Sequence, residues 1–198
     1  TNASGDAKLT NFDGGIYIWE GYDNVIGTDG AGSAPSAEGN LISGNTGNGI
    51  RLYLSQGNTI AGNKIGTNLS GTTAIPNSGS GIYLDRAYFN FIGTTGDGTG
   101  DIYEGNLISG NGGSGIDTTG SGTTDNVIAG NTIGLDVSKT IALPNDEHGL
   151  RLGNNANLNI VGTDGNGTSD TVERNVISGN TLCGVYIDGE QNRVAGNY

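Results

Sequence analysis

The sequence is poor in the residues on which many functional classes of protein depend. It has no Met, one Cys, one His, one Trp and 8 Lys plus Arg against 20 Asp plus Glu, for a net charge of −12. Nucleic acids are bound through Lys and Arg that neutralise phosphates, so we expect no nucleic-acid partner. No apolar run approaches the ~20 residues of a membrane span, so no membrane insertion is expected. A single Cys forms no disulfide within the chain, so the cysteine count does not indicate the compartment of the protein.

The chain also lacks an initiator Met and a signal peptide, and we expect it to be a mature or excised segment. What it has in abundance is Gly, 39 of 198 residues, while only 33% of residues are hydrophobic. So little apolar material leaves two outcomes, disorder or a repeat fold that uses one small pattern many times. Ile, Leu and Val recur at regular spacing, which favours the repeat fold.

Three blocks of sequence align end to end, over residues 1–66, 67–134 and 135–198. Each block contains two Gly-apolar-x-apolar segments. These begin at Gly15, Gly49, Gly81, Gly115, Gly149 and Gly184. An Asn-x-apolar segment follows each of them, and then a third short apolar segment. The pattern predicts one domain over residues 1–198, with six rungs of three short parallel strands.

The alternation of residues along each short strand points its apolar side chains into the coil. The Asn at strand starts are predicted to form ladders, with each side-chain amide bonded to the next rung. Long loops interrupt the rungs at 28–39, 67–77, 94–105, 135–145 and 163–174. Some apolar side chains of the strands face outward and need cover, either from a partner surface or, as we favour, from the loops. The loop residues expected to cover them are Ile75, Ile102, Tyr103, Ile141 and Leu143.

The motif N-x-I-S-G-N…G-I-x-L…N-x-I-x-G-N is most regular in the first block. It resembles the right-handed parallel β-helix repeat of the pectate-lyase-like superfamily, above all the tandem-repeat type of large bacterial surface and secreted proteins. The resemblance covers the whole chain and implies an all-β, right-handed parallel β-helix at the cell surface or outside the cell. It implies no single function, because lyases, hydrolases, epimerases, phage tailspikes and adhesins share the fold.

Enzymes of that superfamily act on polysaccharides along one exposed strand face. Its glycosidases carry clustered aspartates near a Gly-His-Gly, whereas the only histidine here, His148, lacks the preceding Gly. Its lyases carry acids on strands beside basic residues, and the nearest analogue is Asp85 and Asp117 with Arg51 and Arg151. Strand geometry puts the two acids about 8 Å apart, a separation typical of inverting glycosidases. Two acids on one face of an acidic protein are expected by chance, so we predict no catalytic residue.

The residues that precede the first strands form a column in which His148 and Cys183 are neighbours. A Cys–His pair within reach is a candidate nucleophile and base. No third orienting group accompanies the pair, and we interpret the two residues as incidental members of a variable turn.

Two loops resemble calcium-binding loops, with oxygen-bearing side chains at alternate positions. The candidate ligands are Asp97 and Asp101 in one loop, and Asp164, Asn166 and Asp170 in another. Asp-Gly sequences are also ordinary turn chemistry, and the first block departs from the pattern. We therefore predict no cofactor, with calcium as the alternative.

The outward positions of the first strands gather aromatic residues in the N-terminal half of the chain. They place Tyr17, Trp19, Arg51, Tyr53 and Tyr83 on one surface. Exposed stacked aromatic rings suit sugar rings or a protein partner. The alternative is that these side chains only strengthen packing between rungs.

Neither end of the repeat shows an amphipathic helix or a polar closing rung, and the repeat phase at Tyr198 is nearly ready to resume at Thr1. Open ends of a solenoid expose apolar side chains and unpaired strand edges. We therefore predict a structural extracellular rod or fibre module, whose partners are further repeats or copies of itself stacked end to end. The alternative function is a polysaccharide-binding or polysaccharide-degrading module that uses the aromatic surface.

Overall fold

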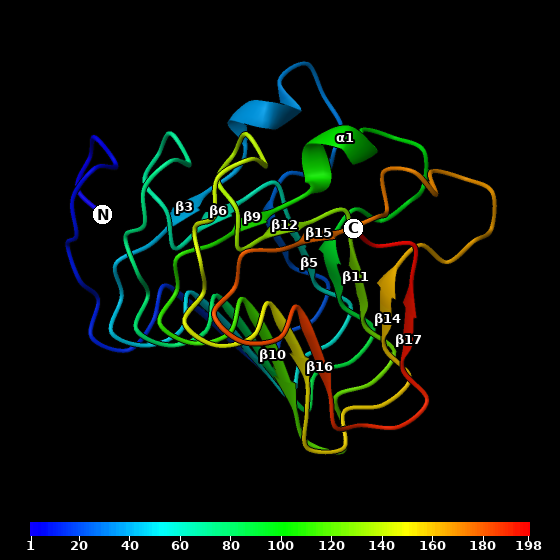
Figure 1. Cartoon of the computed structure of the whole chain (residues 1–198). Coiled ribbons are helices and arrows are strands. Elements are labelled where there is room, and N and C mark those ends of the chain that lie inside the picture. Colours follow the sequence, from blue (N-terminus) through cyan, green and yellow to red (C-terminus); the bar gives the residue numbers. More distant parts are fainter.

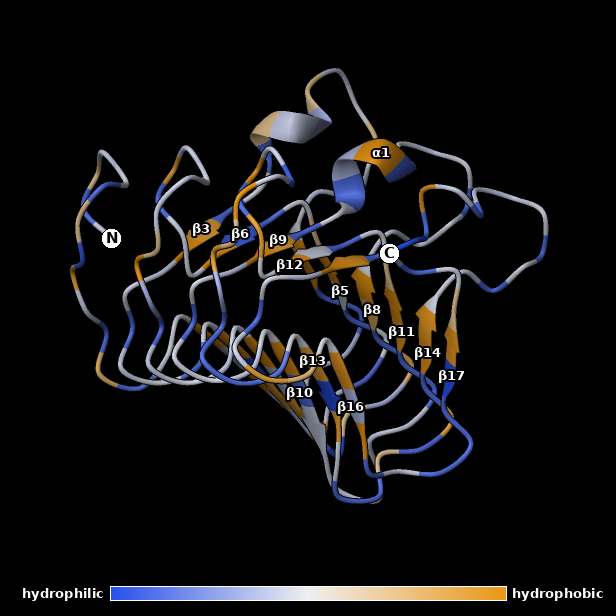
Figure 2. Ribbon diagram, viewed as in Figure 1, coloured by the Kyte–Doolittle hydropathy of each residue, from blue (hydrophilic) through white to orange (hydrophobic).

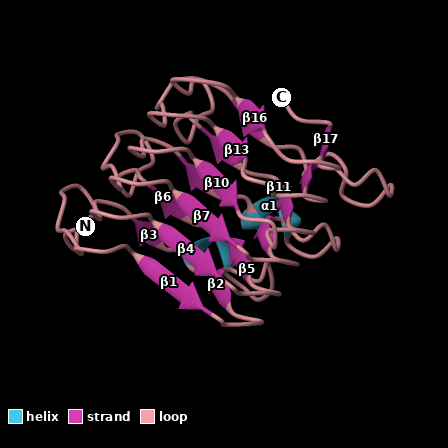
Figure 3. Ribbon diagram, turned by 90° about the horizontal axis from the view of Figure 1, so that it is seen from below, coloured by secondary structure: helices cyan, strands magenta, loops and turns pink.

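The computed structural model describes all 198 residues as a single coil of short parallel strands, with colours running from blue at one end of the coil to red at the other (Figure 1). Three parallel sheets run along the coil, as the repeat predicts. The first sheet contains β1 (Ile16–Trp19), β4 (Ile50–Tyr53), β7 (Ile82–Asp85), β10 (Ile116–Thr119), β13 (Leu150–Leu152) and β16 (Val185–Ile187). Figure 3 shows this sheet face on, as a ladder of parallel arrows.

The other two sheets complete the rungs. The second sheet contains β2 (Val25–Gly27), β5 (Thr59–Ala61), β8 (Phe91–Gly93), β11 (Val127–Ala129), β14 (Ile160–Gly162) and β17 (Arg193–Ala195). The third sheet contains β3 (Leu41–Ile42), β6 (Lys64–Ile65), β9 (Leu107–Ile108), β12 (Thr132–Ile133) and β15 (Val176–Ile177). The prediction of an all-β, right-handed parallel β-helix is confirmed. The sixth rung differs from the prediction because it has no third strand.

The strands bury aliphatic side chains in columns along the axis of the coil. Ile50 pairs in register with Ile82, Ile82 with Ile116, and Ile116 with Leu150. All four side chains are fully buried in a continuous core cluster of 17 residues. Figure 2 shows the hydrophobic colour concentrated on the strands and the hydrophilic colour on the turns. Each fully buried aliphatic side chain contributes about 1.5–3 kcal/mol, so stacking of like on like supplies the core that composition alone leaves scarce.

Asparagine ladders hold the corners of the coil, as predicted, and there are three of them. In each ladder the Nδ2 of one Asn donates to the Oδ1 of the Asn on the next rung, at 2.7–3.1 Å. One ladder precedes the second sheet and contains Asn24, Asn58, Asn90, Asn126, Asn159 and Asn192. Another precedes the third sheet and contains Asn40, Asn63, Asn106, Asn131, Asn175 and Asn197.

The third ladder lies at the corner before the first sheet and was not foreseen from the sequence. It contains Asn11, Asn45, Asn77, Asn111, Asn145 and Asn180. These residues do not start strands, and they share no local motif: three follow Ser-Gly, two follow Pro, and Asn11 follows Leu-Thr. Only their spacing of 32 to 35 residues identifies them as one column.

Glycine is required where the second strands of the first, third and fifth rungs end. Gly93 has a φ of +97°, and a Cβ atom there would lie 1.8 Å from the carbonyl oxygen of Ala129 on the next rung. The left-handed conformation and the close approach of the next backbone together exclude any other residue. Gly27 and Gly162 occupy the same place two rungs before and two rungs after it.

The loops add two single turns of helix, η1 (Pro35–Ala37) and α1 (Asp101–Glu104), and no helix is long and apolar enough to span a membrane. The expectation that apolar loop side chains cover the strands is wrong for Ile102, Tyr103 and Ile141, which are exposed, while Ile75 is buried and Leu143 half-buried. Outward Leu107 is covered instead by the close approach of the loop backbone at Gly71. The backbone can approach that closely because Gly71 has no side chain.

Candidate functional site

The outward positions of the first sheet form two columns, as the repeat predicts. Tyr17 is in register with Arg51, Arg51 with Tyr83, and Tyr83 with Asp117. Beside that column, Trp19 is in register with Tyr53. Neighbouring strands of a sheet lie about 4.8 Å apart, so in-register side chains on one face touch one another.

Five predicted residues come together at the N-terminal end of this sheet, and we call Tyr17, Trp19, Arg51, Tyr53 and Tyr83 the aromatic–arginine surface. The guanidinium carbon of Arg51 lies 5.0 Å from the ring centre of Tyr17, 5.6 Å from that of Tyr53 and 5.7 Å from that of Tyr83. Trp19 stacks on Tyr17 with 6.1 Å between ring centres and meets Tyr53 edge-on at 5.9 Å. Three aromatic faces around one cation fix the position of the guanidinium.

One further member of this region was missed from the sequence. Arg86, immediately after β7, donates to the hydroxyl of Tyr53 at 2.7 Å and lies 4.6 Å from the centre of that ring. It also pairs with the carboxylate of Asp85 at 3.0 Å. Arg86 follows the end of its strand, so the strand alternation that places the other residues makes no prediction for it.

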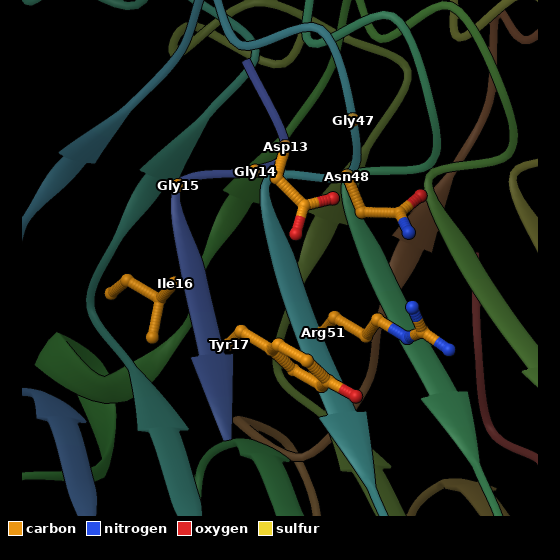
Figure 4. A pocket seen from close by; sticks show the side chains of 8 residues that line it. All are labelled: Asp13, Gly14, Gly15, Ile16, Tyr17, Gly47, Asn48 and Arg51. Carbon is orange, nitrogen blue, oxygen red and sulfur yellow. The ribbon is translucent and has the colours of Figure 1, made fainter. Parts of the chain in front are cut away.

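A hollow of about 220 Å³ adjoins the aromatic–arginine surface where the first two rungs enter the sheet (Figure 4). The polar side chains of Asp13, Asn48 and Arg51 surround it, and Tyr17 forms one wall. The Nε atom of Arg51 is buried and has no hydrogen-bond acceptor. A buried donor without a partner is uncommon, because it costs the desolvation of the group without compensation.

The two acids considered as a hydrolytic pair are each held by an arginine. Asp117 accepts from Arg151 at 3.1 Å, and Asp85 accepts from Arg86 at 3.0 Å. Burial raises the pKa of Asp117 above its ordinary value, and the charge of Arg151 opposes that shift. Burial also raises the pKa of Tyr83, with the charges of both acids adding to the shift. Asp117 therefore forms an ion pair with the next strand, and Asp85 forms one with the residue that follows it.

Two of the five calcium candidates come together, with a third carboxylate that the sequence did not indicate. Asp164, Asp170 and Glu173 place carboxylate oxygens within 4.8 Å of one another. Asn166 takes part only through hydrogen bonds with its own loop, to Asp164 and to the amide of Thr168. All of these acids accept hydrogen bonds within the loop, which is the turn chemistry considered as the alternative.

The remaining two candidates, Asp97 and Asp101, lie in the long loop at 94–105 and accept hydrogen bonds from different groups. Asp97 accepts from the amide of Thr99. Asp101 is buried and accepts from the amide of Gly98 and from the hydroxyl of Ser169 in the long loop at 163–174. Glu104 follows Asp101 in α1 and is also buried; burial raises the pKa of its carboxyl. Asp101 thus joins this loop to the loop at 163–174, whereas Asp97 and Glu104 bond within their own loop.

His148 and Cys183 are neighbours, as their column predicts. The amide of Cys183 donates to Nδ1 of His148 at 3.4 Å, and the imidazole stacks on Tyr186 with 4.8 Å between ring centres. This contact ties the imidazole to the backbone through Nδ1. The contact therefore supports the interpretation of a structural turn.

Comparison with known proteins identifies one family. The sequence model of the family described as "Periplasmic copper-binding protein (NosD)" matches residues 2–133. No curated protein matches the chain, and no solved structure does.

The residues present do not fit the copper of that description. Copper sites in proteins are built from imidazole, thiolate and thioether groups, yet the matched residues contain no His, Cys or Met. The only two such side chains, His148 and Cys183, lie outside the match, and the only three-ligand cluster in the structure consists of carboxylates. The likeness is therefore one of repeat and fold. Because it extends over about two thirds of the sequence and the structure has the same kind of coil, the chain belongs to the NosD family.

Proposed function

We propose that this chain is a structural β-helix element of the cell envelope or the extracellular space, which extends into a rod by adding rungs end to end. The periplasmic description of the family supports a location in the envelope or beyond it. The observation that carries the proposal is the state of the three asparagine ladders at the two ends of the coil.

The ladders have a direction, and their two ends are complementary. At the N-terminal end, the Oδ1 atoms of Asn11, Asn24 and Asn40 receive no hydrogen bond, although each of these residues donates to the next rung. At the C-terminal end, Asn180, Asn192 and Asn197 donate their Nδ2 groups only to backbone carbonyls. One end thus offers acceptors at three corners and the other end offers donors at the same corners.

The apolar core is also open at both ends. Ile187 and Val194, on the last rung, are 48% and 41% exposed, whereas their equivalents Leu152 and Val161, one rung earlier, are fully buried. At the other end Ile16 and Ile18 are only partly buried. Stacking a further rung on either end buries these side chains and pairs the strand edges at once.

The proposal is tested by measuring whether the chain associates head to tail. Sedimentation velocity across a wide range of concentration is expected to show a series of growing species, and electron microscopy is expected to show rods one coil wide. Val194→Lys places a charge on the open core of the last rung and is expected to suppress the association. Val137→Lys makes the same change on an exposed loop side chain away from both ends and serves as the control.

Two outcomes contradict the proposal. One is a chain that stays monomeric at every concentration. The other is an association that Val194→Lys leaves unchanged, because the contact would then lie elsewhere on the molecule. Circular dichroism of both variants shows whether the coil is intact.

A second candidate function is binding of a polysaccharide, and the aromatic–arginine surface favours it. Trp19 and Tyr17 are 63% and 44% exposed and stack on each other, so their rings are accessible side by side. Incubation with a panel of acidic and neutral polysaccharides separates binding from cleavage. Release of oligosaccharides that Asp85→Ala or Asp117→Ala abolishes would contradict the non-catalytic role proposed for the chain.

A further inference from the structure

Arg51 stands apart from the other arginines of the first sheet. Arg86 and Arg151 each form an ion pair with an aspartate, at 3.0 and 3.1 Å, whereas Arg51 has no acidic partner within 4 Å. This is unexpected in a chain with 20 acidic and 8 basic residues. The unpaired guanidinium also borders the hollow and carries the buried Nε that lacks an acceptor.

We propose that the aromatic–arginine surface and the adjoining hollow bind a carbohydrate that carries a carboxylate, a uronic acid residue within a largely neutral oligosaccharide. Arg51 would receive the carboxylate, and the exposed rings would receive sugar faces. The inference rests on the second candidate function, binding of a polysaccharide, and specifies its ligand. It does not depend on the proposed end-to-end assembly.

The guanidinium is prepared for an anion. A planar guanidinium offers two parallel N–H groups that match the two oxygens of a carboxylate. The rings of Tyr17, Tyr53 and Tyr83 around Arg51 restrict its side chain before any ligand arrives. A group that is already ordered loses less conformational entropy on binding.

The hollow supplies groups that suit sugar hydroxyls. The Oδ1 of Asn48 accepts from the amide of Ser80 at 2.8 Å, which leaves its Nδ2 free to donate to a ligand. Asp13 lines the same hollow and supplies a carboxylate acceptor (Figure 4). A donor, an acceptor and a cation around one hollow match a ligand with hydroxyl groups and one negative charge better than they match a bare ion.

The rings of Trp19 and Tyr17 form a platform beside the hollow. Their planes are 29° apart with 6.1 Å between centres, and both project from the outward face of β1. β1 is the edge strand of its sheet, and Trp19 is 63% exposed there, so its ring face is accessible to a ligand. Exposed ring faces of this kind bind the apolar faces of sugar rings.

The net charge of the protein restricts the ligand further. At −12 the chain repels a densely charged polyuronate, because every additional carboxylate beyond the one at Arg51 meets a negative surface. A neutral chain with sparse uronic acid branches avoids that cost. We therefore expect a sparsely charged glycan to bind more tightly than a polyuronate of equal length.

Trp19 is the only tryptophan of the protein, so its fluorescence reports on this surface alone. The titration uses xylo-oligosaccharides that bear one glucuronic acid branch, the same oligosaccharides with the carboxyl reduced to an alcohol, and oligogalacturonate of equal length. The branched acid is expected to change the Trp19 emission in a saturable manner. The reduced form is expected to bind at least about tenfold more weakly, because it lacks the charged hydrogen bonds to Arg51.

Arg51→Gln removes the cation, and Arg193→Gln removes one charge from an exposed arginine of the second sheet as the matched control. Arg51→Gln is expected to weaken binding of the acidic oligosaccharide at least about tenfold and to leave binding of the reduced form unchanged. Thermal unfolding of both variants shows whether the coil is intact.

Three results overturn the inference, and they are distinguishable. Equal affinity for the acidic and reduced oligosaccharides would show that the carboxylate is not recognised, although the surface binds carbohydrate. An equal loss of affinity in Arg51→Gln and Arg193→Gln would show that the affinity for the acidic oligosaccharide depends only on the net charge of the protein. No fluorescence change with any of the ligands contradicts both the inference and the candidate function on which it rests.

Discussion

At the scale of the residue, the asparagine ladders are the most exacting contacts of this fold. Asn126 illustrates why: its Oδ1 accepts from both the amide and the Nδ2 of Asn90, and its Nδ2 donates to Ala87 and Asn159. The residue is fully buried, so no water is available to replace a lost partner. The side chain of Asn126 is short and has one acceptor and one donor group, and through them it connects three rungs.

Asn126→Ala is therefore expected to lower the free energy of unfolding by about 2–4 kcal/mol, because it leaves a buried amide and a buried carbonyl without partners. Asn24→Ala changes the same ladder at its exposed end and is expected to cost less than about 1 kcal/mol. Urea denaturation of both variants measures the difference. Equal losses in the two variants would show that the ladder does not stabilise the interior of the coil.

Glu104 gives a residue-scale prediction that depends on pH. Burial raises its pKa, so the folded chain binds this proton more tightly than the unfolded chain does. The stabilising contribution is therefore fully present below the ordinary pKa of a glutamic acid and is lost as the pH rises through the raised value. Glu104→Gln keeps the acceptor for the amide of Thr95 and removes the charge.

We expect Glu104→Gln to be more stable than the parent at neutral pH and to lose that advantage at about pH 3, where the parent carboxyl is protonated. Unfolding curves at a series of pH values measure the difference. Glu38→Gln makes the same substitution at the equivalent but exposed position of the first long loop and is the control. A constant difference across the pH range would show that the charge of Glu104 has no part in the effect.

At the scale of the element, the sequence predicts most of what repeats and little of what does not. The strands of the first two sheets begin where the Gly and Asn signals place them, because each rung repeats the same two-residue alternation. The third ladder was missed because its members share no local motif. The covering of Leu107 was assigned to apolar loop side chains, yet a glycine in a loop achieves it by close approach of the backbone.

In the candidate site, too, the sequence predicts the positions of residues on strands and not those of residues on turns. Strand register follows from the repeat, so Tyr17, Arg51 and Tyr83 were correctly placed side by side. Asp13 and Asn48 come from turns, and turn side chains have no fixed face in a sequence pattern. That Arg51 lacks an acidic partner while Arg151 has one depends on side-chain directions, which the register of the strands does not specify.

A rung in the middle of the coil is expected to contribute more to stability than a rung at its end, since it is covered on both sides. Leu84 on β7 is fully buried, whereas Ile187 on β16 is 48% exposed. Leu84→Ala is expected to cost about 2–5 kcal/mol and Ile187→Ala less than about 1 kcal/mol. Urea denaturation measures both losses, and hydrogen exchange is expected to show the slowest amides on the central rungs. A larger loss for Ile187→Ala would mean that the last rung is already covered in solution.

At the scale of the whole molecule, the net charge opposes the assembly that the open ends favour. Two copies that meet head to tail bring together two charges of −12, while the ladder hydrogen bonds and the apolar contact act only at short range. Salt screens the repulsion between the two copies, because the Debye length falls from about 30 Å at ~0.01 M to about 8 Å at ~0.15 M. It leaves the short-range hydrogen bonds and apolar contacts almost unchanged. Association is therefore expected to strengthen as the salt concentration rises over this range.

Sedimentation at the two salt concentrations measures this effect directly, with Val194→Lys as the variant in which the open end is blocked. If ion pairs between copies drove the assembly, salt would weaken it instead. A rod that dissolves on adding salt would thus exclude the head-to-tail joining of ladders, even if rods form. A rod that grows with salt and fails to form in Val194→Lys identifies the open core and the three asparagine corners as the joint, because these are the contacts that screening leaves intact.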